Sequence, residues 1–271
     1  MSVRVRSSGG AARVGGGFIQ RVRLDCPGDP PAEPEGPDPV GGQEYPFDLP
    51  VVRELAAAGG LELGPGVTFL VGENGSGKST LVEAIAVAAG FNAEGGSRSF
   101  HFVTRASESS LGQHLLLRWG VRKPRTGFFL RAESFYNVAT EIDRLDPGGG
   151  WLLPSYGGRS LHERSHGESF LNLVTHRFGP NGLYVLDEPE AALSPRGCLA
   201  LIARIIELVA QGSQFVVATH SPMLLAVPGA RILQIDQTGR IDRVDYDEAD
   251  PVSLTRAFLA APEQFLRHLA P

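Results

Sequence analysis

The chain has 271 residues, of which 42% are hydrophobic, which is ordinary for one large or two small globular domains. Its formal net charge of -5 argues against a generally basic nucleic-acid-binding surface, although arginines precede the first acidic residue, Asp25, and leave a local phosphate contact open. No run of about 18 apolar residues is present, so we expect no membrane insertion, and two unclustered cysteines suit a cytoplasmic protein.

Composition divides the chain into a tail and one domain. Residues 1–17 are rich in glycine and arginine and predict a flexible basic tail, whereas residues 18–271 predict a single domain. Residues 26–42 form a Pro/Gly-rich insertion without periodicity, and residues 134–180 predict a small helical region.

Hydrophobic periodicity then predicts the elements in chain order. Strands are expected at residues 18–24, 67–71, 114–119, 127–131, 183–186, 215–219, 231–235 and 240–244. Helices are expected at residues 51–58, 79–89, 134–144, from about 168, at 195–210, and twice near the end of the chain. Buried strands that alternate with helices predict an α/β fold with a mostly parallel core sheet and an antiparallel side sheet.

A glycine-rich loop between a buried strand and a helix carries the strongest chemical signal. Residues 72–79 fit the pattern G-x-x-x-x-G-K-[ST], in which backbone N–H groups point inward at phosphate oxygens. Lys78 is expected to reach the β- and γ-phosphates of ATP, and Ser79 to ligate Mg²⁺. The residues predicted to bind the nucleotide here are Gly72, Glu73, Asn74, Gly75, Ser76, Gly77, Lys78, Ser79 and Thr80.

A second signal is a pair of adjacent carboxylates after the apolar run at residues 183–186. The run delivers Asp187 and Glu188 to the carboxyl end of a strand, where open α/β sheets bind their ligands. Asp187 is expected to hold Mg²⁺, directly or through water. Glu188 is expected to orient and deprotonate the attacking water.

The order of the motifs resembles that of ABC-type ATPases from about residue 18 to residue 244. Residues 165–168 (Ser-His-Gly-Glu) resemble the family's signature, and His220 resembles its switch histidine after a buried strand. The resemblance implies that Ser165 and Gly167 cap the γ-phosphate bound to a second copy, so that ATP drives homodimer formation. It also implies that His220 hydrogen-bonds the γ-phosphate and helps to place the water.

Three positions depart from the family pattern. Glu133 stands where the family has a glutamine that contacts Mg²⁺ and water, and we expect it to substitute as a metal ligand. Ser194 replaces the aspartate of the loop that couples the two sites in transporters. The aromatic residue that stacks on adenine is expected about 25 residues upstream of the loop, where Tyr45 and Phe47 both qualify.

The spacing of the motifs favours one branch of the family. Only 31 residues separate Glu133 from Ser165, without heptads, so no coiled-coil arm of the SMC kind is expected. The 51 residues after His220 are too few for an appended nuclease domain. The chain looks most like small stand-alone bacterial ATPases, and we expect slow ATP hydrolysis that serves an unidentified protein partner. The alternatives are the ATP-binding subunit of a membrane transporter, a P-loop small-molecule kinase, and a nucleotide-binding scaffold without turnover.

Overall fold

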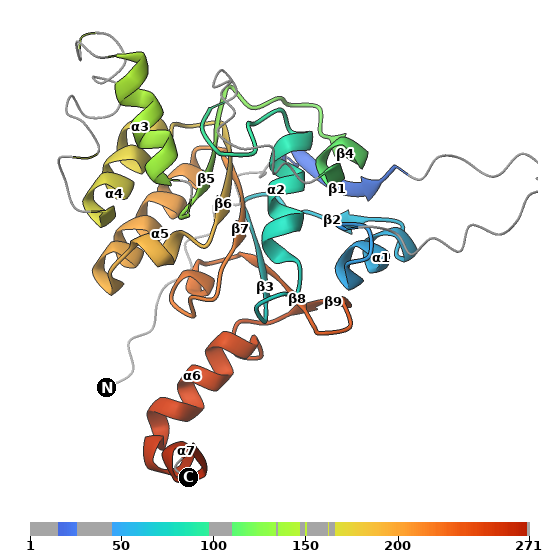
Figure 1. Ribbon diagram of the computed structural model, residues 1–271, viewed down its shortest axis with the longest axis vertical. Helices are drawn as coiled ribbons and strands as arrows, with labels where there is room; N and C mark the ends of the chain where they lie inside the picture. Colours follow the sequence, from blue (N-terminus) through green and yellow to red (C-terminus); the bar gives the residue numbers. More distant parts are fainter. Residues whose placement is uncertain are drawn as a thin grey trace, which may run out of the picture.

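The computed structural model describes residues 16–25, 45–97, 110–133, 135–146, 150, 162 and 166–269. Two β-sheets and the helices around them make an α/β fold (Figure 1). The predicted insertion at residues 26–42 lies outside the described residues, as does nearly all of the predicted tail at residues 1–17.

The larger sheet has six strands in the order β5-β6-β7-β3-β8-β9. All neighbours are parallel except β9, which pairs antiparallel with β8 at one edge. The predicted mostly parallel core sheet is therefore confirmed. Its strands are β3 (Val67–Gly72), β5 (Thr126–Arg131), β6 (Gly182–Asp187), β7 (Gln214–Ala218), β8 (Arg231–Ile235) and β9 (Ile241–Val244).

The smaller sheet is antiparallel and confirms the predicted side sheet. It consists of β2 (Leu61–Glu62), β1 (Ile19–Leu24) and β4 (Leu115–Trp119), in that order. The sequence did not predict β2, because a strand of two residues is too short to show an alternating pattern.

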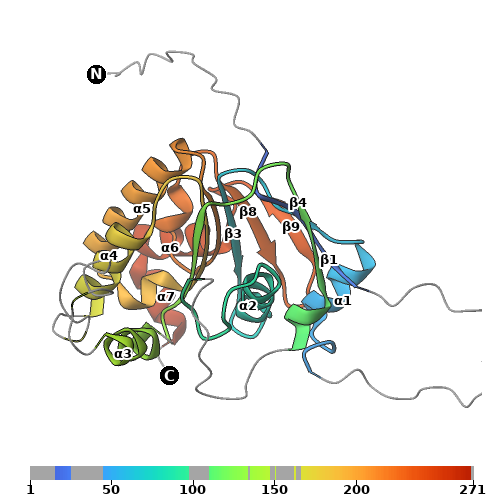
Figure 2. The same ribbon diagram turned by 90° about the horizontal axis from the view of Figure 1, so that it is seen from above.

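The helices lie within about two residues of their predicted limits. They are α1 (Pro50–Ala57), α2 (Lys78–Ala88), α3 (Phe135–Leu145), α4 (His166–Arg177), α5 (Pro195–Ala210), α6 (Asp250–Ala260) and α7 (Pro262–Leu269). Figure 2 shows α2 on one side of the core sheet, with the side sheet and α1 beyond it, and α4 and α5 on the other side. The start of α5 follows from its sequence, since Ser194 accepts a hydrogen bond from the N–H of Gly197 and Pro195 begins the first turn.

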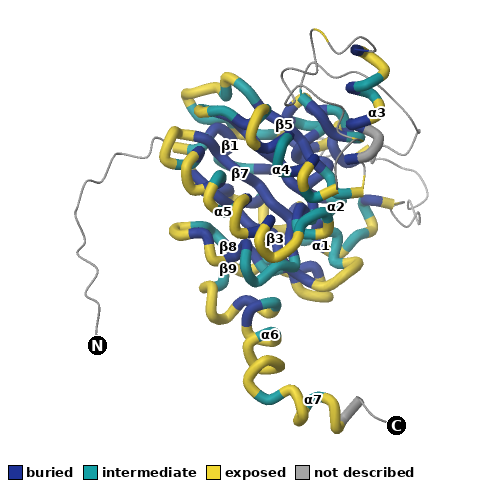
Figure 3. Tube along the Cα trace, turned by 90° about the vertical axis from the view of Figure 1, so that its left-hand side faces the viewer, coloured by how far each residue is buried: buried dark blue, intermediate teal, exposed yellow. Residues whose placement is uncertain are grey.

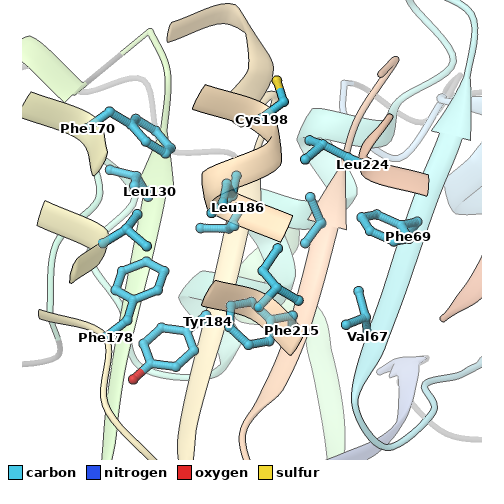
Figure 4. Packing of buried hydrophobic residues seen from close by; sticks show 14 of the residues in the cluster. Val67, Phe69, Leu130, Phe170, Phe178, Tyr184, Leu186, Cys198, Phe215 and Leu224 are labelled. Atoms are coloured by element: carbon cyan, nitrogen blue, oxygen red, sulfur yellow. The ribbon is translucent and has the colours of Figure 1, made fainter. Parts of the chain in front are cut away.

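Both faces of the core sheet are buried, which explains why its strands are continuously apolar. Phe69, Phe128 and Tyr184 point into the layer that α4 and α5 cover, whereas Leu70 and Phe129 point to the side of α2. In the first layer the rings of Phe178 and Tyr184 stack with centroids 4.1 Å apart (Figure 4). Side chains of successive residues in a strand thus pack into opposite apolar layers, and the sheet lies between the two layers.

The two C-terminal helices contrast with this core. Figures 1 and 3 show α6 and α7 extending away from the sheets, with much of their surface exposed. Among the described residues, no helix is long and apolar enough to cross a membrane.

One buried side chain joins the two sheets. Gln214, at the start of β7, is 1% exposed. Its Oε1 accepts a hydrogen bond from the N–H of Ile19 at 2.9 Å, and its Nε2 donates to the carbonyl oxygens of Ile19 at 2.8 Å and Gly64 at 2.9 Å. The amide therefore replaces a missing backbone partner between β1 and β7.

Replacing this amide is expected to weaken the junction of the sheets. Gln214→Leu keeps the volume but leaves three buried backbone groups unpaired, so we expect the free energy of unfolding to fall by about 3 kcal/mol. Urea denaturation followed by circular dichroism measures the change. The exposed Gln211→Leu is the matched control, and equal stability of the two variants would contradict this role of Gln214.

Candidate nucleotide site

The predicted site residues gather at one edge of the core sheet. Gly72 is the last residue of β3, and Asp187 is the last residue of β6. His220 is the second residue after the end of β7. These strands are parallel neighbours in the order β6-β7-β3, so their carboxyl ends open onto the same edge. This is where open α/β sheets bind ligands.

The loop from β3 to α2 has the backbone conformation that a phosphate cradle needs. Gly75 and Gly77 have φ angles of 82° and 88°, in the left-handed region. A Cβ atom at Gly77 would lie 2.5 Å from Cγ1 of Val51, so only glycine fits there. The Oγ of Ser76 is buried and has no hydrogen-bond partner among the described residues, as expected for a hydroxyl that awaits a ligand.

Lys78 begins α2 directly behind this loop and is 4% exposed. Its Nζ donates a hydrogen bond to the carbonyl oxygen of Glu73 at 2.9 Å, which folds the side chain back over the loop. Burial lowers the pKa of the Lys78 amine, and the carboxylates of Glu188 and Asp187 oppose this effect. The amine thus lies in an enclosed setting with acidic groups nearby, where a phosphate would be a strong additional partner.

Ser79 and Asp187 meet as the predicted metal site requires. The Oγ of Ser79 donates to Oδ1 of Asp187 at 3.0 Å, and Asp187 is 5% exposed. Burial raises the pKa of Asp187 from 3.8 to about 6, while the Arg131 guanidinium and the Ser79 hydroxyl act in the opposite direction. Among the described residues, no group of three or more His, Cys, Asp and Glu side chains is placed to hold a metal ion. One hydroxyl and one carboxylate nevertheless fit Mg²⁺, which usually takes its other ligands from water and nucleotide phosphates.

Glu188 directs its side chain toward His220. The backbone of Glu188 is left-handed, with φ 48° and ψ 51°, which turns the chain sharply after β6. Its N–H donates to the carbonyl oxygen of Ala218 at 3.0 Å. Oε1 of Glu188 lies 3.5 Å from Nε2 of His220, a long contact for a hydrogen bond. The two side chains therefore lie close together, and their roles as a base and a switch histidine stay predictions.

Glu190 is a site residue that the sequence analysis missed. Its Oε1 accepts hydrogen bonds from Thr219 Oγ1 at 2.7 Å and from the backbone N–H of His220 at 2.6 Å. It therefore fixes the loop that carries the histidine. The repeated glutamate in Glu188-Pro189-Glu190 was the available signal, but its partner lies about 30 residues away in the sequence.

Arg131 and Glu83 were also missed. Arg131 ends β5, and its Nη1 lies 2.6 Å from Oε2 of Glu83 on α2. Its Nε lies 3.5 Å from Oδ2 of Asp187. The sequence signal for Glu83 is its position as the one carboxylate of α2, inside the apolar run that follows Thr80.

The predicted metal ligand Glu133 lies two residues beyond Arg131. Its side chain is 90% exposed, and its Oε2 lies 3.9 Å from Nη2 of Arg131. It is thus linked to Asp187 through the arginine, and its contact with a metal stays a prediction.

The two candidates for the adenine-stacking aromatic differ in their surroundings. Tyr45 is 65% exposed, and its hydroxyl lies 3.4 Å from Oγ1 of Thr80 at the start of α2. Phe47 packs against the core and meets the ring of His114 edge-on at 5.1 Å. The ring of Tyr45 is therefore free to contact a base beside the glycine-rich loop.

The predicted signature is described only in part, because Ser165 lies outside the described residues. Gly167 is in the first turn of α4, where an added Cβ would lie 3.2 Å from the carbonyl oxygen of Ala192. A cavity of about 400 Å³ lies beside this contact and is lined by Gly167, Glu168, Leu171, Ala192, Leu193, Ser194, Arg196 and Gly197.

Two family models match parts of the chain. One, described as an AAA domain, covers residues 58–126, and the other, described as "AAA domain, putative AbiEii toxin, Type IV TA system", covers residues 154–226. The first includes the glycine-rich loop, and the second includes Asp187, Glu188 and His220. The chain has a P-loop ATPase fold, and both models describe an AAA domain. The two AAA-domain matches suggest nucleotide hydrolysis as the class of activity of this P-loop protein.

Several solved structures are similar to this P-loop protein at low sequence identity. The SMC head domain from Thermotoga maritima is 17% identical, with 69% of this chain and 93% of that chain covered and a TM-score of 0.39. A nucleotide-free ATP-binding cassette from an ABC transporter is 18% identical, with 72% and 87% covered and a TM-score of 0.42. The chain is also 17% identical to cbiO1 from Clostridium perfringens, part of the ABC transporter complex cbiONQ. That match covers 78% of this chain and 89% of that chain, with a TM-score of 0.41. No curated protein sequence matches the chain.

The raised pKa of Asp187 predicts that the free energy of unfolding of the protein without nucleotide depends on pH. The pKa of Asp187 is about 6 in the folded protein and 3.8 in the unfolded chain, so the folded protein binds this proton more tightly. The stabilisation by this proton is fully present below pH 3.8 and is lost as the pH rises through 6. Asp187→Asn removes this titration. From pH 4 to pH 7, we expect its free energy of unfolding to rise relative to wild type by about 3 kcal/mol at most.

Denaturant unfolding in EDTA at a series of pH values measures this difference. The exposed Asp245→Asn is the matched control for loss of one surface carboxylate. A difference between Asp187→Asn and wild type that stays constant with pH would show that Asp187 is not strained by its burial.

Proposed function

We propose that this chain binds ATP with Mg²⁺ and hydrolyses it. The observation that carries the proposal is the convergence of Lys78, the Ser79–Asp187 pair and the Glu188–His220 pair at one edge of the sheet. Each pair comes from segments far apart in the sequence, and together they supply a phosphate cradle, a metal site and a base.

The glycine-rich loop and Lys78 bind the phosphates in this proposal. Backbone N–H groups of residues 72–77 and the N-terminus of α2 face the phosphate oxygens. Lys78 exchanges its hydrogen bond with Glu73 for the β- and γ-phosphates, and Tyr45 covers the adenine. Ser79 and Asp187 would hold Mg²⁺, which would supply positive charge beside the β- and γ-phosphate oxygens.

Glu188 and His220 act on the water that attacks the γ-phosphate. Glu188 accepts a proton from the water, and His220, held by Glu190 through its backbone, donates a hydrogen bond to the γ-phosphate. The 3.5 Å separation of Glu188 and His220 leaves both groups available for these new partners.

A second copy completes the site in our proposal. Ser165, together with Gly167 in the first turn of α4, faces the γ-phosphate bound by the partner in this arrangement, so that ATP holds two copies together. Within one copy, Gly167 lies beside Ala192, so the first turn of α4 and the segment after Glu188 would meet the partner together. The exposed Ser194 lies at the same cavity and faces the partner as well.

Other functions remain as alternatives with clear tests. A transporter subunit would bring a permease with it when purified from membranes. A small-molecule kinase would consume ATP only when an acceptor is added, whereas the ATPase proposed here consumes ATP without one. A scaffold would bind ATP without releasing phosphate.

Lys78→Ala is expected to abolish detectable ATP binding, because it removes the positive charge at the β- and γ-phosphates. Titration with a fluorescent ATP analogue measures the affinity. Lys123→Ala is the matched control, since Lys123 is the other lysine of the chain and lies over the ring of Trp119 at 4.1 Å. Unchanged affinity in Lys78→Ala would mean that the loop is not the nucleotide site.

Glu188→Gln is expected to trap an ATP-bound dimer. The amide keeps the shape of the side chain but cannot accept the proton, so hydrolysis stops and the nucleotide continues to bridge two copies. Size exclusion with light scattering, in ATP and Mg²⁺, in ADP, and without nucleotide, measures the mass. We expect the dimer with ATP only, and Glu248→Gln, an exposed glutamate near α6, to behave as wild type. A monomeric Glu188→Gln in all three conditions would overturn the dimer mechanism.

A further inference from the structure

Four side chains form a closed polar ring between the glycine-rich loop and the core sheet. Ser79 and Glu83 are four residues apart on α2 and therefore lie on the same side of that helix. Ser79 donates to Oδ1 of Asp187 at 3.0 Å, and Oδ2 of the same carboxylate lies 3.5 Å from Nε of Arg131. Nη1 of Arg131 donates to Oε2 of Glu83 at 2.6 Å, which returns the ring to α2.

The members of the ring are shielded from water. The side chains of Asp187, Glu83 and Arg131 are 7%, 11% and 23% exposed. A carboxylate in such a place is costly unless a positive charge or a hydrogen-bond donor compensates it. The two carboxylates share one guanidinium, so the ring retains a formal charge of -1 that suits a divalent cation.

The guanidinium also favours one direction of the Asp187 carboxylate. Oδ1 of Asp187 accepts the hydrogen bond of Ser79, and Oδ2 lies 3.5 Å from Nε of Arg131, an ion pair without a hydrogen bond, so turning the carboxylate would lose both interactions. Glu83 in turn fixes Arg131 by the short contact at 2.6 Å. Only a planar fork with several donors can reach both acids from the end of β5, because a lysine offers a single point charge.

We propose that Arg131, anchored by Glu83, is a positioning residue that orients Asp187 toward Ser79 and thereby sets the affinity of the site for Mg²⁺. The inference rests on the proposed function, in which Ser79 and Asp187 hold the metal. Glu83 connects α2, which carries Ser79, to β5, which ends at Arg131. The contacts of the ring therefore hold both proposed metal ligands, Ser79 and Asp187, in place.

The test measures how much Mg²⁺ the binding of a fluorescent ATP analogue requires. In Arg131→Met the Mg²⁺ concentration for half-maximal binding should rise about tenfold to hundredfold, which is typical when a residue that orients a metal ligand is lost. Arg131→Lys should also raise it, since the amine cannot span both acids. Binding of the analogue in EDTA should stay within about twofold of wild type, because phosphate contacts by the loop are intact.

Two further variants separate positioning from a general loss of structure. Arg125→Met removes an exposed arginine just before β5 and should leave the Mg²⁺ requirement unchanged. Glu83→Gln should raise the requirement, and the double variant Glu83→Gln/Arg131→Met should be no worse than Arg131→Met alone, because the two residues act in one chain. Electron paramagnetic resonance of Mn²⁺ gives an independent reading of metal affinity.

The outcomes distinguish this inference from the proposed function. An unchanged or lower Mg²⁺ requirement in both Arg131 variants overturns the inference, and a lower one would show that Arg131 competes with the metal. Equal weakening of binding with Mg²⁺ and with EDTA also overturns it, because that is the effect of a structural role alone. If wild type binds the analogue and Lys78→Ala does not, the proposed function survives these results. If wild type binds no nucleotide, both proposals fail.

Discussion

The backbone register of four parallel strands is the constraint on which the site depends. In this register Arg131 of β5 pairs with Asp187 of β6, and Asp187 pairs with Ala218 of β7. Leu70 of β3 then pairs with Ala218, so the glycine-rich loop starts two residues beyond the same row. A shift of one residue in any of these strands would turn its side chains to the opposite face and remove its end from the site. The apolar layers on both sides of the sheet oppose such a shift, because each strand fills both of them.

Acidic side chains are concentrated where the row of Arg131, Asp187 and Ala218 lies beside the glycine-rich loop. Asp187, Glu188, Glu190 and Glu83 lie close together, and the described residues place Lys78 and Arg131 beside them as positively charged side chains. The nucleotide-free protein therefore keeps acidic groups in a poorly hydrated place, and the raised pKa of Asp187 reflects this burial. A site of this kind is stabilised by a cation that arrives with a polyanion, since each ligand alone would add an unbalanced charge. Binding of nucleotide and of metal should accordingly be coupled.

The sequence predicted the parts of the site that lie within continuous motifs. Lys78, Ser79, Asp187 and Glu188 could be assigned roles because a buried strand directly precedes each motif and fixes where its residues emerge. Arg131, Glu83 and Glu190 could not, because their roles come from contacts between elements, such as the 2.6 Å contact of Arg131 with Glu83. The packing of Phe47 against His114, which distinguishes it from the exposed Tyr45, likewise lies outside what the sequence predicts. The strand β2 escaped prediction because two residues carry no period.

The distribution of lysine has a practical consequence for following this protein in solution. Lysine occurs only at Lys78, which is 4% exposed, and at Lys123, which is exposed beside Trp119. Acylating reagents should therefore modify Lys123 readily and reach Lys78 only when the loop opens. In a mass spectrum the ratio of the two modified peptides then reports the opening of the glycine-rich loop, with an internal standard in the same chain. These reagents do not modify arginine at neutral pH, so the many arginines of the chain do not add modified peptides to the measurement.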